Sequence, residues 1–276
     1  MARLWSSGFE LNTTTQNVEL TGATDAGLTI VTTPVLSGTY AGRVLNGTVA
    51  TRFEYKFGTA GLSDGIYVRA YIRIATAPSA ITTVVRVGDS GANRRAALRL
   101  ATDRTLELWD SAGKIGSSSS ALALDTWYRL ELFYKTGATA SLTGRVDGTD
   151  FASTTTSSNV GNVNFARFGN DDGVATVDLY FDDIAINDDT GSNQTSWPGA
   201  GKIVHLKPNA AGDNAQGTRG GTDSGSDFGQ VDEVTPNDTT DYYILDADND
   251  ILELRSCEIE QLVSRVAPVK VILQND

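Results

Sequence analysis

The sequence contains one cysteine and one histidine in 276 residues, and these two scarcities exclude several kinds of chemistry. Cys257 has no second cysteine for an internal disulfide and no companions for a zinc site built on thiolates. His205 lacks the second histidine or cysteine that a metal or nucleophile site needs, and no acidic residue near it in sequence is placed to complete a triad. We therefore expect structural roles for both residues.

Long apolar runs and dense runs of positive charge are also absent. No segment approaches the roughly 20 apolar residues of a membrane span, so we expect no membrane insertion. The opening residues, "MARLWSSGFELNTTT", lack the continuous apolar stretch of a secretory signal. With a formal net charge of −12 and no stripe of Lys and Arg along the chain, the protein is expected to repel nucleic-acid phosphates rather than bind them.

Alternation of apolar and polar residues with period two is the strongest positive signal. In "GIYVRAYIRIAT" the residues Ile66, Val68, Ala70, Ile72 and Ile74 share one face of a strand, and the intervening Tyr and Arg residues share the other. The same pattern recurs in "TWYRLELFYK", "TTVVRVG", "RRAALRLA", "TLELWD", "TASLTGRVDG", "VNFARFG" and "ATVDLYFDDIAIN". With 28 glycines and turn-forming connectors between these runs, the pattern predicts an all-β antiparallel sandwich or jelly roll.

The segment "SWPGAG" suggests a domain boundary, because Pro198 between glycine-rich flanks cannot continue a central strand. We predict a jelly-roll domain over residues 1–196 and a small, mainly β, C-terminal module over 197–276. The module is expected to contain a strand at "KIVHLKPN", a long polar loop at "AAGDNAQGTRGGTDSGSDFG", a short helix over roughly 256–264 and a final strand at "PVKVILQ".

Acidic residues are plentiful and suggest two kinds of site, a catalytic carboxylate pair and a calcium site. A glycosidase needs two carboxylates facing each other across a sugar, roughly 5 to 10 Å apart, and the single strand carboxylates Glu107 and Glu131 do not form an obvious pair. "DADNDILE" fails as an EF-hand because its sixth and twelfth positions are Ile251 and Cys257. Clustered oxygen ligands for calcium remain in the turns "NDDG" and "NDDTGSN", which contain Asp171, Asp172, Asp188 and Asp189; such residues are also what turns prefer.

The tryptophans offer a different kind of site. Trp5 and Trp109 could stack on sugar rings if they lie exposed, which keeps a carbohydrate-binding role open. Trp127 begins an alternating strand and is expected in the core. No phosphate-binding loop, catalytic residue or bound cofactor is predicted, and the chain is not expected to be an enzyme.

Three segments resemble the concanavalin A-like, or laminin G-like, jelly-roll group. "DTWYRLELFY" is similar to a Trp-Tyr-x-Leu-x-Leu strand of that group, "GRVDGTDFA" to the hairpin after it, and "VDLYFDDIAIND" to its closing strand with an Asp-Asp pair. These motifs imply the fold and say little about function.

A second set of segments resembles structural proteins of tailed bacteriophages and prophages: "RLWSSGFELNTTTQNVEL", "WPGAGKIVHLKPNAAGDNAQ" and "VDEVTPNDTTDYY". The resemblance implies a non-enzymatic component of the virion exterior, either capsid decoration or part of the tail and adsorption apparatus. It would fold in the host cytoplasm, and its partners would be other phage structural proteins, sister subunits and host-surface glycans. The last segment would be an assembly connector, with Asp232, Glu233, Pro236, Asp238, Thr240 and Tyr242 as its defining residues.

Two alternatives stay open at this point. A carbohydrate-binding module for host-surface recognition would use the tryptophans and the Asp/Asn loops. A polysaccharide hydrolase on the same fold is the weaker alternative. We also expect the 197–276 module to complete its small core by pairing with a neighbouring subunit, since its few strands leave sheet edges open.

Overall fold

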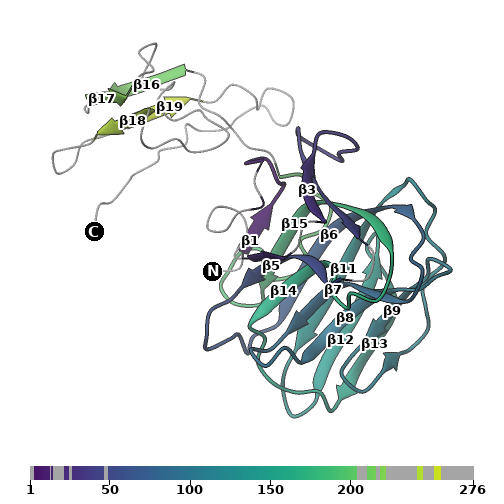
Figure 1. Ribbon diagram of the computed structural model, residues 1–276. Coiled ribbons are helices and arrows are strands. Elements are labelled where there is room, and N and C mark those ends of the chain that lie inside the picture. The colour runs from purple at the N-terminus through teal and green to yellow at the C-terminus, as the bar shows by residue number, and fades with distance from the viewer. Residues whose placement is uncertain are drawn as a thin grey trace. The chain divides into compact units, whose positions relative to one another are not determined.

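The computed structural model describes residues 3–12, 14, 22–24, 27–46, 49–203, 210–215, 218–221, 241–244 and 252–255. The chain divides into two compact units, Met1–Val204 and His205–Asp276. All regular structure in the described residues is β-strand, and none of them forms a helix able to cross a bilayer. Figure 1 shows the strands of the first unit arranged as two stacked sheets. The predicted all-β antiparallel sandwich is therefore confirmed.

One sheet has eight strands in the order β13-β12-β11-β6-β15-β4-β3, with β1 pairing on β15 beside β4. Every pairing in it is antiparallel. Its strands are β1 (Arg3–Ser7), β3 (Leu28–Val31), β4 (Ala41–Asn46), β6 (Ile66–Thr76), β11 (Trp127–Lys135), β12 (Ala140–Val146), β13 (Thr149–Ser157) and β15 (Val177–Asp188).

The other sheet has seven strands in the order β10-β9-β8-β7-β14-β5-β2, and the run from β5 to β9 can be followed across Figure 1. Its pairings are also antiparallel. The strands are β2 (Gly22–Thr24), β5 (Thr51–Lys56), β7 (Thr82–Gly88), β8 (Arg94–Leu100), β9 (Leu106–Trp109), β10 (Lys114–Ile115) and β14 (Phe165–Asn170).

The core lies between the sheets and follows the predicted alternation. Ile72 of β6, Leu132 of β11 and Leu98 of β8 belong to one apolar cluster and are fully buried. Alternate residues point outward, as expected for strands with one buried face. Trp127 pairs in register with Arg73 on the outward side of the eight-stranded sheet and is not part of the core cluster. Its expected core position is wrong, because the alternation that buries Leu130 and Leu132 turns Trp127 the other way.

The last residues of the first unit, 196–203, pack on the sandwich and are called the exit segment here. Trp197 lies over the guanidinium of Arg145 at 4.0 Å and within 5.2 Å of the Tyr67 ring. The carbonyl of Gly199 accepts a 3.0 Å hydrogen bond from Arg69, and the amide of Ile203 donates to Asp183 at 2.5 Å. The exit segment is thus held at several points along its length.

The second unit contains two short antiparallel pairs among its described residues. β16 (Ala210–Ala215) pairs with β19 (Leu252–Arg255), and β17 (Thr218–Gly221) pairs with β18 (Asp241–Ile244). Part of the expected long polar loop is therefore strand, because ladder hydrogen bonds between backbones can hold a segment that has few apolar side chains. The expected helix at 256–264, the final strand and most of "KIVHLKPN" lie outside the described residues.

Candidate functional site

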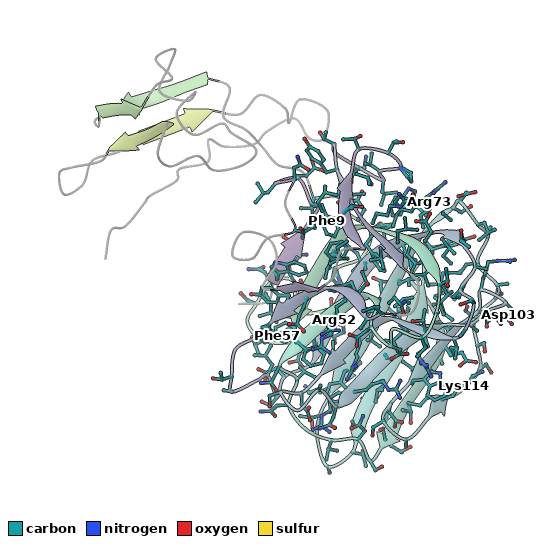
Figure 2. The ribbon with its side chains drawn as sticks, viewed as in Figure 1. Phe9, Arg52, Phe57, Arg73, Asp103 and Lys114 are labelled. Atoms are coloured by element: carbon teal, nitrogen blue, oxygen red, sulfur yellow. The ribbon has the colours of Figure 1, made fainter. Side chains whose placement is uncertain are left out.

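Five arginines point outward from the seven-stranded sheet and form what we call the arginine face. Four of them alternate along their strands with buried residues, which turns them away from the core, and the fifth, Arg94, lies at a β-bulge opposite Gly88. They come from four strands: Arg52 on β5, Arg86 on β7, Arg94 and Arg99 on β8, and Arg167 on β14. Figure 2 labels Arg52 and Lys114, which come from strands toward opposite ends of this sheet.

Strand register aligns part of the face as one continuous row across six strands. Glu54 lies opposite Arg167, Arg167 opposite Arg86, and Arg86 opposite Ala97. Ala97 in turn lies opposite Trp109, and Trp109 opposite Lys114. Neighbouring strands are about 4.8 Å apart, so the five steps of this row span about 24 Å. A surface of that length suits an extended chain better than a single small molecule.

One buried carboxylate holds three of the arginines. The Asp171 side chain is 2% exposed and lies 2.6 Å from Arg86, 3.2 Å from Arg52 and 3.5 Å from Arg167. Arg167 also pairs with Glu54 at 2.5 Å. Because three guanidiniums share Asp171, the charge at this end of the face is only partly neutralised.

Two aromatic rings support the guanidiniums. Arg99 lies 4.7 Å and Arg94 5.5 Å from the centre of the Trp109 ring, whose Nε1 donates to Glu107 at 2.8 Å. The Phe165 ring holds Arg167 at 3.9 Å and Arg86 at 5.5 Å. Cation–π contacts of this kind orient a guanidinium without consuming its hydrogen-bond donors.

Arg94 differs from its neighbours because it has no carboxylate partner. No ion pair or hydrogen bond joins its side chain to any residue in the part of the chain that the structure describes. The two carboxylates that act on it at longer range are engaged elsewhere: Asp172 with Arg99 at 2.9 Å and Asp110 with Ser157 at 2.6 Å. Burial, reinforced by the nearby Arg99 and Arg86 charges, lowers the pKa of Arg94. Its positive charge is therefore poorly compensated.

The charge balance of the face is opposite to that of the whole chain. Among the described residues, the five arginines and Lys114 give six cations, and the carboxylates paired with them number four, leaving a net charge of +2. The four carboxylates are Glu54, Glu107, Asp171 and Asp172. The chain as a whole carries −12. The sequence has no run of basic residues, yet the sheet assembles one in space.

The outer face of the eight-stranded sheet is different in character. Arg43 forms a two-point ion pair with Asp178, with both contacts at 2.9 Å, and lies 5.3 Å from the Tyr180 ring. Arg73, labelled in Figure 2, pairs with Asp125 at 2.7 Å. Arg129 lies 3.3 Å from the buried Glu131 carboxylate. These three cations therefore have individual carboxylate partners, whereas Arg3 of β1 donates to the side-chain amide oxygen of Asn187 at 2.6 Å.

A buried carboxylate pair marks the point where β15 changes partners. β4 pairs with β15 up to Phe181 and β1 pairs with it from Ile184, so Asp182 and Asp183 occupy the gap. Asp182 accepts hydrogen bonds from the amides of Leu36 and Ser37 at 2.9 and 3.3 Å.

Asp183 has positive φ, 46°, and its carboxylate accepts from the Ser37 hydroxyl and the Ile203 amide. Burial, and then the neighbouring Asp183 charge, raise the pKa of Asp182 to about 7. Burial also raises the pKa of Asp183. These carboxylates bind backbone donors that the gap in strand pairing leaves free, which indicates a structural role.

The four residues considered for calcium each bind groups of this chain. Asp171 and Asp172 pair with arginines of the face, Asp188 accepts from the amide and hydroxyl of Thr190, and Asp189 binds Lys135 and the Gly65 amide. Within the described ranges no cluster of three or more His, Cys, Asp and Glu residues is arranged to hold a metal ion.

The two tryptophans considered for glycan stacking lie in different surroundings. Trp109 is on the arginine face between two guanidiniums. Trp5 is half-buried against the core and stacks on Tyr55 at 4.9 Å. Of the connector residues, Tyr242 lies in β18, opposite Gly220, and Asp232, Glu233, Pro236, Asp238 and Thr240 are outside the described residues. His205 and Cys257 are also outside them.

Glu107 and Glu131, the strand carboxylates weighed for hydrolysis, do not share a site. Glu107 alternates with the core residues Leu106 and Leu108, and Glu131 with the core residues Leu130 and Leu132. The two glutamates therefore point outward from different sheets, away from each other. They cannot flank one glycosidic bond.

No model of a known protein family and no curated protein matches this chain. Solved structures do resemble it. An endo-β-1,4-glucuronan lyase from Trichoderma reesei superposes with a TM-score of 0.51 at 11% identity, covering 67% of this chain and 95% of the lyase.

Two further structures are similar to this chain at lower TM-scores. A cellulose-induced protein gives a TM-score of 0.47 at 18% identity, covering 66% of this chain and 90% of its own. A carbohydrate esterase from the Shiga toxin-encoding bacteriophage phi24B gives 0.46 at 19%, covering 60% of this chain and 89% of its own. At these identities the likeness concerns the fold alone, a β-sandwich.

Proposed function

We propose that this protein is a non-enzymatic component of the exterior of a bacteriophage particle, and that its sandwich binds carbohydrate through the arginine face. The phage assignment rests on the resemblance of the opening, linker and connector segments to tailed-phage structural proteins. The binding assignment rests on one observation: a row that contains Arg167, Arg86, Trp109 and Lys114 spans six strands on one side of the sandwich, with further arginines beside it.

A sugar chain matches the chemistry of this row. Saccharide hydroxyls pair with planar guanidinium donors, and the apolar faces of sugar rings contact aromatic edges. Trp109 lies in the row itself, and Phe165 is adjacent to it on β14. The fold is shared with a protein named as a glucuronan lyase, which is compatible with carbohydrate as the ligand class.

Binding without catalysis fits the carboxylates of the face better than hydrolysis does. Each of Glu54, Glu107, Asp171 and Asp172 lies within 3.5 Å of a cation, and the guanidinium of Arg167 bridges Glu54 and Asp171. A carboxylate engaged as the counter-ion of an arginine or lysine suits a structural role better than the role of a general acid. The proposal includes no cofactor and no metal.

In this proposal the second unit attaches the protein to the particle or to sister subunits, in either a capsid-decorating or a tail-associated position. Its short two-stranded pairs suit a module that gains stability from a partner, since isolated pairs of strands are marginal in water. The protein would fold in the host cytoplasm before assembly. Immunogold labelling of intact particles, with an antibody against the sandwich, tests exterior display; labelling only after disruption would contradict it.

A glycan array of the purified protein tests carbohydrate binding. We expect specific signals that Trp109→Ala weakens, because the ring orients Arg94 and Arg99. Trp127→Ala is the matched control, since Trp127 is a half-buried tryptophan on the outer side of the other sheet. An array without signals would overturn the carbohydrate assignment. If both variants lose the same share of the signal, the arginine face is not the binding surface.

A further inference from the structure

We infer that the ligand of the arginine face is an acidic saccharide chain, carrying carboxylate or sulfate groups, and that Arg94 contacts one of these anionic groups. The inference rests on the proposed carbohydrate binding and adds the chemical class of the sugar and the residue that selects it.

The first support is the local excess of positive charge. The described residues of the face carry +2 within a chain of −12, so the sign of the face cannot come from overall composition. A neutral saccharide would need donors and acceptors but no surplus of cations. Partly buried like charges repel one another, and an anionic ligand relieves that repulsion in the complex.

The second support is the state of Arg94. Its charge has no carboxylate partner in the described part of the chain, its Nε is buried without a hydrogen bond, and Trp109 holds its guanidinium 5.5 Å from the ring centre. Arg99, on the same strand, also has a buried Nε without a hydrogen bond, but its guanidinium pairs with Asp172 at 2.9 Å and lies 3.5 Å from the Ile81 carbonyl. Arg94 is therefore an oriented guanidinium with donors to spare, and a carboxylate or sulfate is the group that a guanidinium binds in two-point geometry.

The third support is local backbone geometry. The register between β7 and β8 shifts between the Val87–Ala96 and Gly88–Arg94 pairs, a bulge that assigns two residues of β8 to one of β7. Bulges re-aim side chains. Here Arg94 joins the arginine face, while the adjacent Arg95 instead binds Asp89 at 2.9 Å and Asn159 at 2.9 Å.

Nucleic acid is the competing linear polyanion, and the charge of the rest of the chain disfavours it. Duplex DNA carries one charge per about 1.7 Å and would extend beyond a face of about 24 Å onto an acidic surface. A saccharide with about one charge per sugar ring or per disaccharide presents fewer charges to that surface. The Debye length of about 10 Å at 0.1 M salt keeps the attraction local to the face.

The experiment measures binding of the full chain to polyglucuronate, heparin, neutral dextran and duplex DNA by biolayer interferometry, at about 0.02 M and about 0.2 M salt. We expect binding to polyglucuronate or heparin that weakens with salt, and weaker binding to dextran and DNA. A preference for polyglucuronate identifies carboxylate as the recognised group, and a preference for heparin identifies sulfate.

Variants at Arg94 test the residue itself. Arg94→Gln is expected to weaken acidic-saccharide binding by about 10-fold or more, the loss of a charge-assisted contact, and Arg94→Lys by less. Arg43→Gln is the matched control, a cation over an aromatic ring on the other sheet, and leaves binding unchanged. Circular dichroism and the thermal midpoint establish that each variant folds.

The outcomes separate this inference from the proposed function. Array signals for neutral glycans, with no binding to either acidic polymer, would overturn the inference and leave carbohydrate binding intact. No binding to any glycan would overturn both. Equal affinity of wild type and Arg94→Gln would overturn the role of Arg94, and DNA bound as tightly as the better acidic polymer would overturn the ligand class.

Discussion

Replacing Asp171 with asparagine is expected to destabilise the sandwich strongly. The carboxylate is 2% exposed and lies within 3.5 Å of three guanidiniums, and the amide keeps its size while removing its charge. Breaking a buried ion pair by removing one partner costs about 3–5 kcal/mol. Arg167 retains Glu54, and all three guanidiniums have some contact with solvent, so we expect the lower end, about 3 kcal/mol.

Urea unfolding followed by tryptophan fluorescence measures this loss, and calorimetry gives the midpoint. For a domain of this size, about 3 kcal/mol corresponds to a fall of about 6–12 °C. Asp178→Asn is the matched control, because its pair with Arg43 on the other sheet is more exposed, and its expected cost is about 1 kcal/mol or less. Equal losses for the two variants would refute the assignment of Asp171 as the shared counter-ion of the face.

The same substitution should act on binding in the opposite direction. Removing one negative charge takes the described residues of the face from +2 to +3, so Asp171→Asn should bind an acidic saccharide more tightly although it is less stable. If stability and affinity fall together, Asp171 positions the arginines for the ligand, and the simple charge argument fails.

Two further predictions concern Asp182 on β15 and the docking of the exit segment. Burial and the Asp183 charge raise the pKa of Asp182 to about 7, whereas an unfolded aspartate titrates near about 3.9. Between these two pH values the folded protein keeps a proton on Asp182 that the unfolded chain has lost. The stability that this proton contributes is fully present below about pH 4 and is lost as the pH rises through about 7. The urea midpoint should therefore fall between about pH 4 and about pH 7, and Asp182→Asn should make that fall smaller. The second prediction concerns Gly8, where a Cβ would lie 2.5 Å from the Ile203 carbonyl oxygen. Gly8→Ala should therefore displace the exit segment and speed tryptic cleavage after Lys202. An unchanged cleavage rate would contradict the fixed docking of the exit segment.

Much of the fold could be predicted because period-two alternation is a local property of the sequence. "GIYVRAYIRIAT" and "TWYRLELFYK" became β6 and β11, with the expected faces inward. Short strands such as β2 and β10 carry too few residues for an alternation to be seen. The strands β16 and β17 lie in segments without apolar anchors, so only their pairing partners reveal them.

The arginine face was missed for a different reason. Arg52, Arg86 and Arg167 are far apart in sequence, and only the strand order β7-β14-β5 makes them neighbours. A signal did exist, since arginine occupies an outward position in "TRFEYK", "TTVVRVG", "RRAALRLA" and "VNFARFG". The sequence identified Asp171 only as a candidate calcium ligand in a turn, because its ion-pair partners are brought to it by the tertiary structure.

The exit segment has a mechanical consequence. Tension applied to the chain beyond Ile203 would load the hydrogen bonds from Ile203 to Asp183 and from Arg69 to Gly199. Those bonds end on β15 and β6, which lie within the eight-stranded sheet and not at its edge. Strands loaded there must shear against partners on both sides, which breaks many hydrogen bonds at once, whereas an edge strand can be peeled off one bond at a time. A pull transmitted through the exit segment would therefore act on interior strands of the sheet and not on an edge strand.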